Sequence, residues 1–321
     1  MLLDIDNLTL RLTDREARPL LSEVSLQVAA GEVVGLVGES GSGKSTTARA
    51  ALRMLPAAAD VTGTVRHNGR DVLTMSPAEL RRHRARNVSM IYQDPRASLN
   101  PVRRIGDFLT ERLVRVLGQT KNEANANAVR LLGDVGLSDP ERRLRQYPHE
   151  LSGGMLQRVV IAAGLATDPG LLLADESTSA LDVTTQAEIL VLLKALQAEH
   201  GMGLLFITHD LHLAAAYCDR VYVMYAGRVA EHQSARDLFT QPRHPYTRGL
   251  LDCSPALGES KELRPIPGRP PSLSDTRPGC PFAPRCAHAE DACTSWTPEL
   301  STADGVEVSC RRAAVLERSL V

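Results

Sequence analysis

The chain has 321 residues, which is enough for one large domain and a smaller second unit. Its 37 basic and 38 acidic side chains nearly cancel, and 43% of its residues are hydrophobic, as in an ordinary globular protein with no general attraction for nucleic acid. Its apolar runs fall far short of the roughly 20 residues that a membrane-spanning helix needs.

The first residues alternate apolar and acidic side chains, as in Leu3-Asp4-Ile5-Asp6, which predicts a strand and not a secretory signal. We therefore expect the protein to stay in the cytoplasm. Short runs rich in Val, Ile and Leu then alternate with helical patterns, which is typical of α/β proteins with a parallel sheet. The expected buried strands are Val33–Val37, Val88–Tyr92, Leu171–Asp175, Leu204–Thr208 and Val221–Tyr225, and the expected helices are Lys44–Leu55 and Thr184–Glu199.

Two changes of pattern divide the chain. Helical signals replace strand signals over about residues 95–166, which predicts a helical subdomain inserted into the sheet domain. After about Pro255, proline and glycine become dense, which indicates a linker and a loop-rich appendage. We therefore expect a large domain over residues 1–255 and a C-terminal region over residues 256–321.

A phosphate-binding loop is predicted between the expected strand Val33–Val37 and the helix that begins at Lys44. Glycines there let backbone N–H groups approach phosphate oxygens, and the helix N-terminus adds a favourable dipole. Lys44 would neutralise phosphate charge, and the Ser45 hydroxyl would bind Mg²⁺. A glycine-rich turn with a chance lysine is the weaker alternative in this strand-to-helix setting. The expected phosphate-binding residues of the loop are Gly38, Glu39, Ser40, Gly41, Ser42, Gly43, Lys44, Ser45 and Thr46.

Two carboxylates follow the predicted strand Leu171–Asp175. The carboxyl ends of parallel strands border the crevice in which such sheets bind ligands. Asp175 would therefore hold Mg²⁺, and Glu176 would take a proton from the attacking water. A solvated acidic turn is the alternative, but the catalytic interpretation is favoured over it once the phosphate loop is accepted.

The segment Leu151-Ser152-Gly153-Gly154-Met155-Leu156-Gln157-Arg158 resembles the signature of the ATP-binding cassette (ABC) family. Other family motifs stand in order around it: Gln93 resembles the glutamine of the Q-loop, Ser179-Ala180-Leu181-Asp182 the loop that contacts the opposite subunit, and His209 the switch histidine. The resemblance covers about residues 1–255. It implies a phosphate-loop NTPase (RecA-like) core with the inserted helical subdomain and an antiparallel β edge.

The resemblance also implies how ATP is bound and hydrolysed. Two cassettes would meet head to tail, so that Ser152, Gly153 and Gly154 of one cap the ATP held by the other. Glu176 would be the general base and His209 would contact the γ-phosphate. Gln93 would bind and sense Mg²⁺ at the nucleotide and relay closure to the membrane subunits. Every one of these positions carries the family's residue, which predicts a hydrolysing cassette. Residues 1–30 contain no Phe, Tyr or Trp, although the family usually stacks adenine on an aromatic ring there.

The stretches 244–251 (His-Pro-Tyr-Thr-Arg-Gly-Leu-Leu) and 265–271 (Pro-Ile-Pro-Gly-Arg-Pro-Pro) resemble the oligopeptide, dipeptide and nickel importer branch. That resemblance implies a different second ATPase subunit, two membrane permease subunits, an extracytoplasmic solute-binding protein and a place on the cytoplasmic face of the membrane. Uptake of peptides is the expected function; nickel or another small solute, and an ABC ATPase outside transport, are the alternatives. Long heptads and a second phosphate loop, which non-transport cassettes would need, are absent from the sequence.

Four of the six cysteines gather near the end of the sequence, at Cys280, Cys286, Cys293 and Cys310. In a reducing compartment metal binding is a better expectation for them than disulfides. Their spacing departs from that of common zinc modules, so zinc is not specifically indicated. The family resemblance favours a [4Fe–4S] cluster, and four reduced structural thiols remain the alternative.

Overall fold

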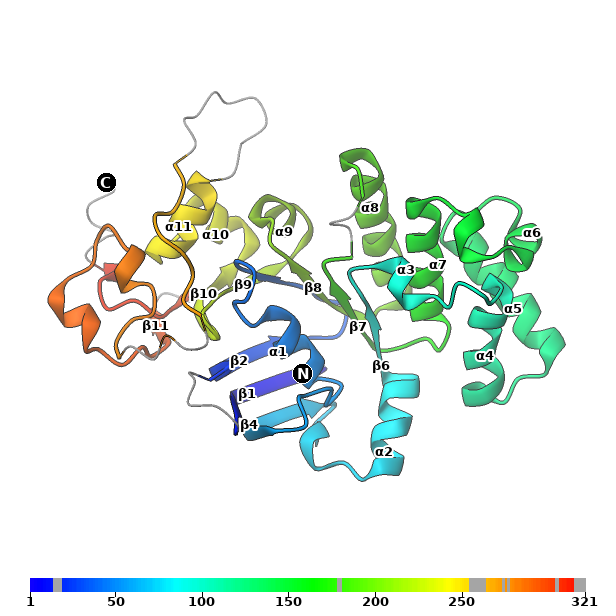
Figure 1. Ribbon diagram of the computed structural model, residues 1–321, viewed down its shortest axis with the longest axis horizontal. Coiled ribbons are helices and arrows are strands. Elements are labelled where there is room, and N and C mark those ends of the chain that lie inside the picture. Colours follow the sequence, from blue (N-terminus) through cyan, green and yellow to red (C-terminus); the bar gives the residue numbers. More distant parts are fainter. Residues whose placement is uncertain are drawn as a thin grey trace.

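The structure is a computed structural model, and it describes residues 1–13, 19–177, 181–253, 264–272, 275, 278–303 and 306–314. Its centre is a sheet in which the described strands follow the order β11-β12-β10-β9-β3-β8-β7-β6 (Figure 1). Every residue of β3 is buried, as expected for a strand covered on both faces. The strands are β3 (Val33–Val37), β6 (Val88–Ile91), β7 (Leu171–Asp175), β8 (Gly203–Thr208), β9 (Arg220–Tyr225), β10 (Arg228–Ser234), β11 (Ser301–Ala303) and β12 (Val306–Val308).

Strands β9, β3, β8, β7 and β6 run parallel to one another, and their order differs from their order in the sequence. The predicted buried strands are therefore found, each within about one residue of its expected bounds. Parallel strands place their carboxyl ends on one edge of the sheet. That edge carries the residues that follow β3, β7 and β8.

A second, antiparallel sheet has the order β2-β1-β4-β5 and supplies the expected antiparallel edge of the fold. Its apolar face shares a core with the central sheet, in which Leu3, Leu36 and Ile207 are fully buried. Helix α1 (Lys44–Ala50) ends earlier than expected, because Arg53 adopts a left-handed conformation that closes the helix with a turn. The strands are β1 (Leu3–Leu12), β2 (Leu21–Val28), β4 (Ala59–His67) and β5 (Arg70–Asp71).

The predicted helical insertion forms a group at one end of the molecule (Figure 1). Leu109, Leu132 and Val159 are buried in its core, which is continuous with that of the central sheet. Gly164 of α7 faces Ile91 of β6, where a Cβ on it would lie in ordinary van der Waals contact with the Ile91 side chain. The helices are α3 (Pro95–Ser98), α4 (Ile105–Leu117), α5 (Lys121–Asp134), α6 (Pro140–Arg145) and α7 (Gly153–Leu165).

The remaining helices connect the strands and begin the C-terminal region. They are α2 (Pro77–Arg82), α8 (Val183–His200), α9 (Leu211–Tyr217), α10 (Ala235–Thr240) and α11 (Pro245–Asp252), with the short helical segments η1 (Val72–Thr74), η2 (His83–Asn87), η3 (Pro148–Glu150), η4 (Ala283–Arg285) and η5 (Asp291–Thr294). Among the described residues, no helix has the length and apolar character needed to span a bilayer.

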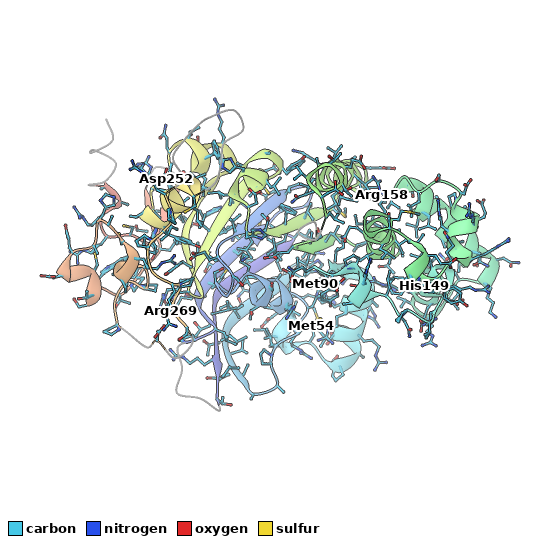
Figure 2. The ribbon with its side chains drawn as sticks, turned by 45° about the horizontal axis from the view of Figure 1, so that its top comes forward. Met54, Met90, His149, Arg158, Asp252 and Arg269 are labelled. Carbon is cyan, nitrogen blue, oxygen red and sulfur yellow. The ribbon has the colours of Figure 1, made fainter. Side chains whose placement is uncertain are left out.

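The C-terminal region lies beside β9 and β10, at the end of the molecule opposite the helical group (Figure 1). Figure 2 shows the same separation, with His149 and Arg158 at one end and Arg269 at the other. Strand β12 pairs with β10, so this region extends the central sheet and is more than the loop-rich appendage expected. The pairing covers what would otherwise be an open sheet edge. The predicted division at residue 255 lies outside the described residues and stays a prediction.

Candidate nucleotide-binding site

The predicted phosphate loop joins β3 to α1, as its motif requires. Gly38 passes so close to the neighbouring strand that a Cβ on it would lie 2.2 Å from the Met224 carbonyl oxygen. Gly43, directly before α1, has a φ of 106°, which favours glycine. Both glycines are therefore required by the shape of the loop.

The Lys44 ammonium is folded back into this loop. The residue as a whole is 5% exposed, and its Nζ donates to the carbonyl oxygens of Gly38 (2.7 Å) and Glu39 (3.0 Å). Burial lowers the pKa of Lys44 below its ordinary value, while the nearby carboxylates of Glu176 and Asp175 act in the opposite direction. A buried cation bonded to two neutral carbonyls is well placed to receive an anion.

Ser45 and Asp175 meet across the edge of the sheet although 130 positions separate them. The Ser45 hydroxyl donates to Asp175 Oδ1 at 2.8 Å. Burial raises the pKa of Asp175, and the bond from Ser45 opposes this rise. The structure thus brings together Ser45 and Asp175, two of the three side chains expected at the Mg²⁺ ion. Oxygen ligands of this kind suit that ion.

Glu176, Gln93 and His209 also converge at this edge. Gln93 Nε2 donates to Glu176 Oε2 at 2.9 Å, and His209 Nδ1 lies 3.7 Å from Glu176 Oε1. Glu176 has a φ of 46°, and its backbone N–H donates to the Ile207 carbonyl of β8 at 3.0 Å. That strained conformation turns its carboxylate towards residues from two other strands.

The signature residues lie elsewhere, at the start of α7 in the helical group (Figure 1). Ser152 is exposed and is the N-cap of this helix, because its Oγ accepts from Met155 N at 3.4 Å. Gly154 packs against α8, where a Cβ would lie 2.8 Å from Thr185 Cγ2. One chain thus presents Ser152, Gly153 and Gly154 apart from its own phosphate loop.

The remaining predicted loop residues fall where expected, with Ser40 and Gly41 exposed and Thr46 partly buried in α1. Ser42 Oγ is buried without a hydrogen-bond partner in the described structure. An orphaned hydroxyl beside the buried Lys44, with Ser45 and Asp175 nearby, fits a magnesium–triphosphate group. Of the predicted intersubunit loop, Ser179 and Ala180 lie outside the described residues.

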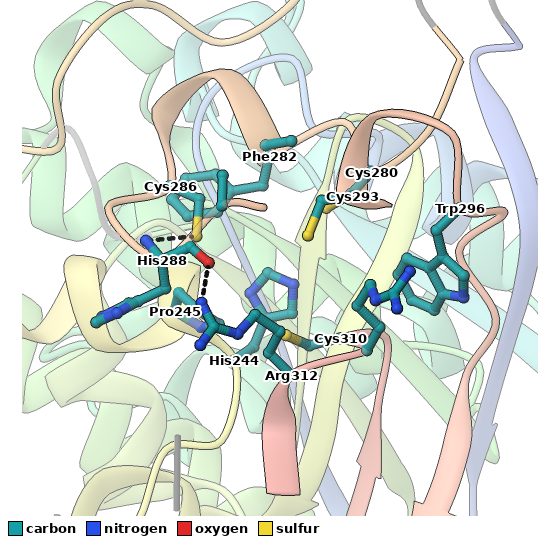
Figure 3. A pocket seen from close by; sticks show the side chains of 13 residues that line it. His244, Pro245, Cys280, Phe282, Cys286, His288, Cys293, Trp296, Cys310 and Arg312 are labelled. Carbon is teal, nitrogen blue, oxygen red and sulfur yellow. Dashed lines mark hydrogen bonds between the residues drawn. The ribbon is translucent and has the colours of Figure 1, made fainter. Parts of the chain in front are cut away.

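The four clustered cysteines line one cavity in the C-terminal region, together with His244 and Trp296 (Figure 3). Burial raises the pKa values of three of these thiols, that of Cys310 to about 11, so these thiols are neutral at pH 7. Within the described ranges, however, no three His, Cys, Asp or Glu side chains are placed so that they could hold a metal ion. The cysteines therefore converge as predicted without forming a ready metal site.

Comparison with known proteins identifies the family. The ABC transporter family model matches residues 21–179, and the model for the C-terminal region of oligopeptide/dipeptide transporters matches residues 230–293. The oligopeptide transport ATP-binding protein OppD of Escherichia coli K12 is 47% identical over 279 residues, covering 87% of this chain and 83% of that protein. The chain belongs to the ATP-binding subunits of ABC transporters, in the oligopeptide/dipeptide branch.

Further relatives and solved structures agree with this assignment. OppD of Haemophilus influenzae is 45% identical over 303 residues, covering 94% of each chain. The dimeric ATP-binding cassette MJ0796, bound to ADP and phosphate, superposes with a TM-score of 0.64 at 28% identity, over 73% of this chain and 99% of that one. The protein cbiO1 of Clostridium perfringens, part of the ABC transporter complex cbiONQ, gives a TM-score of 0.66 at 26% identity, over 75% of this chain and 91% of that one.

The predicted family, fold and enzyme class of this ABC subunit are therefore confirmed. It is an ATPase that uses ATP with Mg²⁺ and serves as the ATP-hydrolysing part of a transporter. As a subunit of a membrane transporter, it is implied to associate with the membrane through that transporter.

Two residues that hold the phosphate loop of this ABC subunit were missed by sequence reasoning. The Glu39 backbone N–H donates to the Tyr246 hydroxyl at 2.8 Å, and the Glu39 carboxylate pairs with Arg285. The stretch 244–251 pointed to Tyr246 only as a family resemblance. Arg285 stands among prolines and cysteines, and nothing in its neighbourhood signals a contact with residue 39.

Proposed function

We propose that this ATPase lies at the cytoplasmic face of the membrane and drives the uptake of oligopeptides into the cell. It would pair with a different ATPase subunit beneath two permease subunits, with an extracytoplasmic solute-binding protein delivering the peptide. The observation that carries this proposal is the match of residues 230–293 to the C-terminal region of oligopeptide/dipeptide transporters. The relatives described as oligopeptide transport ATP-binding proteins support the same solute class.

The solute can be tested with the assembled transporter in vesicles. ATP enclosed on the side of this subunit should drive accumulation of labelled oligopeptides delivered with the binding protein, and the permeases and second ATPase should co-purify. Nickel ions and free amino acids are the matched competitors. Uptake of nickel with no uptake of peptide would contradict the proposal and leave the ATPase assignment intact.

At the nucleotide site, we propose that ATP is held between two subunits. Its phosphates would lie on the loop 38–46 of one subunit and under Ser152, Gly153 and Gly154 of the other. The exposed N-cap Ser152, at the start of α7, supports this arrangement. The bound nucleotide would thus join the phosphate loop of one subunit to the signature residues of the other, and ATP hydrolysis would let the two subunits separate.

Within that site, Glu176 is the proposed general base and Asp175 and Ser45 the proposed magnesium ligands. Gln93 would orient Glu176 and sense the ion, and His209 would contact the γ-phosphate. The bond from Gln93 to Glu176 and the proximity of His209 to the same carboxylate support these roles. A water between Glu176 and the γ-phosphate would lose its proton to Glu176 Oε1 or Oε2 as it attacks.

The variant Glu176→Gln tests the base directly. It should slow ATP turnover by about 10²–10⁴-fold, the usual contribution of a general base, with ATP binding retained. Glu141→Gln, an exposed substitution in α6, is the control and should keep full activity. Steady-state hydrolysis at the normal rate in Glu176→Gln would remove Glu176 from this role.

For the cysteine cavity, we propose that Cys280, Cys286, Cys293 and Cys310 hold a [4Fe–4S] cluster. Their number, their chemistry and their shared cavity support it, since four thiolates are the usual ligands of this cluster. The thiols would have to lose their protons and draw closer than they lie here. Such a cluster would supply a structural crosslink between the segment that carries η4, the segment η5 and the residues that follow β12.

Anaerobic purification tests the cluster. Protein holding it should show broad absorbance near 400 nm with about four irons per chain, and Cys293→Ser should lose both. Cys218→Ser, at a buried cysteine in the central core, is the control and should keep them. Colourless, iron-free protein from anaerobic cells grown with excess iron would reject the cluster in favour of reduced structural thiols.

A further inference from the structure

An ion pair links the phosphate loop to the C-terminal region. Arg285 donates from Nη1 to Glu39 Oε2 at 2.7 Å and from Nη2 to Glu39 Oε1 at 3.0 Å. Two parallel bonds between a guanidinium and a carboxylate fix orientation as well as distance. Because Glu39 follows Gly38 directly, this pair acts on the backbone that must cradle phosphate.

Arg285 is itself held firmly by residues of the C-terminal region and of β9. Only 6% of its side chain is exposed. Its Nε donates to the Pro267 carbonyl at 2.9 Å, and its guanidinium lies over the rings of Tyr225 (5.8 Å) and Phe282 (6.0 Å). These contacts hold the guanidinium where it meets the Glu39 carboxylate.

Tyr246 provides a second link to the same loop residue. Its hydroxyl accepts the Glu39 backbone N–H at 2.8 Å, and the side chain is fully buried. Its ring packs against those of Tyr225 and Phe282, with centroids 4.6 and 5.4 Å away. Side chain and backbone of Glu39 are thus both bound to one aromatic cluster.

One ring of that aromatic cluster, Phe282, forms part of the wall of the cysteine cavity. Phe282 lines the cavity together with Cys280 and Cys286, on either side of Arg285 in the sequence. His244 also lines it, and this residue is the N-cap of the helix that carries Tyr246. A change in the packing of the cavity would therefore reach both contacts of Glu39.

We infer that Arg285, with Tyr246, is a positioning residue that sets the phosphate loop for ATP and so couples the state of the cysteine cavity to ATP affinity. An intact cavity keeps the loop in its binding shape, and a disturbed one weakens ATP binding. The inference rests on the proposed nucleotide site at residues 38–46. It does not depend on which group the cysteines hold.

The test separates ATP affinity from turnover. Arg285→Gln should raise KM for ATP by about tenfold or more, the effect of losing a charge-assisted pair, while kcat at saturating ATP changes much less. Arg285→Lys should recover only part of the loss, since an ammonium cannot form both bonds and stack. Arg269→Gln, an exposed arginine in the same region, should leave both constants unchanged.

Glu39→Gln gives an independent arm that leaves the C-terminal region intact. If the pair acts as proposed, the double variant Arg285→Gln/Glu39→Gln should be no worse than either single variant. If the KM increase of the double variant equals the product of the two single increases, Arg285 acts on the fold and not through Glu39. That result would overturn the inference. So would an unchanged KM in Arg285→Gln.

A third arm tests the cavity itself. Phe282→Leu alters the wall without touching the loop, and it should raise KM for ATP in the same direction by a smaller factor. A normal KM in this variant would overturn the coupling to the cavity. Wild-type protein that fails to bind ATP at all would instead count against the proposed nucleotide site.

Discussion

The buried carboxylate of Glu231 offers a sharp test of how the C-terminal region is anchored. Glu231 lies in β10 and is 0% exposed. Its Oε1 accepts from Arg243 N (2.6 Å) and Gln233 Nε2 (3.0 Å), and its Oε2 accepts from His244 N (3.0 Å). One side chain thus holds the turn that begins α11, the helix of Tyr246.

The cost of removing this carboxylate follows from the donors it leaves behind. Each buried donor that loses its acceptor costs about 1–3 kcal/mol, so Glu231→Leu, which strips two backbone N–H groups, should lower the free energy of unfolding by about 2–6 kcal/mol. Glu231→Gln retains one oxygen acceptor and should lose about 1–3 kcal/mol. Burial raises the pKa of Glu231, so part of the loss is offset because a costly buried charge disappears.

Urea unfolding measures the loss, and amide hydrogen exchange locates it. Exchange should accelerate first at His244, Tyr246 and the rest of the first turn of α11, before the central strands respond. Glu299→Leu, at an exposed position of the same region, is the control and should change stability by less than about 0.5 kcal/mol. A loss below about 1 kcal/mol in Glu231→Leu would refute the anchoring role.

Three further tests follow from other residues. Gly38→Ala should abolish ATP binding in a filter assay, because its Cβ would lie 2.2 Å from the Met224 carbonyl, whereas Gly133→Ala, with open space, should bind normally. Burial lowers the pKa of His67 from 6.5 to about 4, so the unfolded chain takes up a proton at this histidine before the folded chain does. The free energy of unfolding should therefore fall as the pH drops from about 6.5 to about 4. Urea titrations at stepped pH should show a shallower fall in His67→Leu. Asp210→Ala removes the N-cap of α9 and should cost about 1 kcal/mol in thermal melts, while Asp210→Asn should keep most of the cap.

Most of the central architecture was predictable from local patterns. The five parallel strands are short apolar runs between turn residues, and the loop after Val37 carries its own glycines and lysine. The meeting of Ser45 with Asp175 could be expected as well, because both follow strands that end on one edge of a parallel sheet.

What the sequence did not reveal depends on contacts between distant segments. Strand β12 has three residues and no pattern that separates it from a loop, and it forms only because β10 offers an edge. The bonds of Glu39 to Tyr246 and Arg285 join positions 207 and 246 residues apart in the sequence. No periodicity can encode such a meeting, which arises from how aromatic rings pack in three dimensions.

The pairing of β12 with β10 also bears on how the polypeptide is synthesised. Residues near 230 leave the ribosome well before Val308 does, so β10 stays without its β12 partner during that part of synthesis. Pairing of segments so far apart in sequence is slow, and an uncovered strand can meet the same strand of another growing chain. We therefore expect the uncovered edge of β10 to be a part of the growing chain that benefits from chaperone protection.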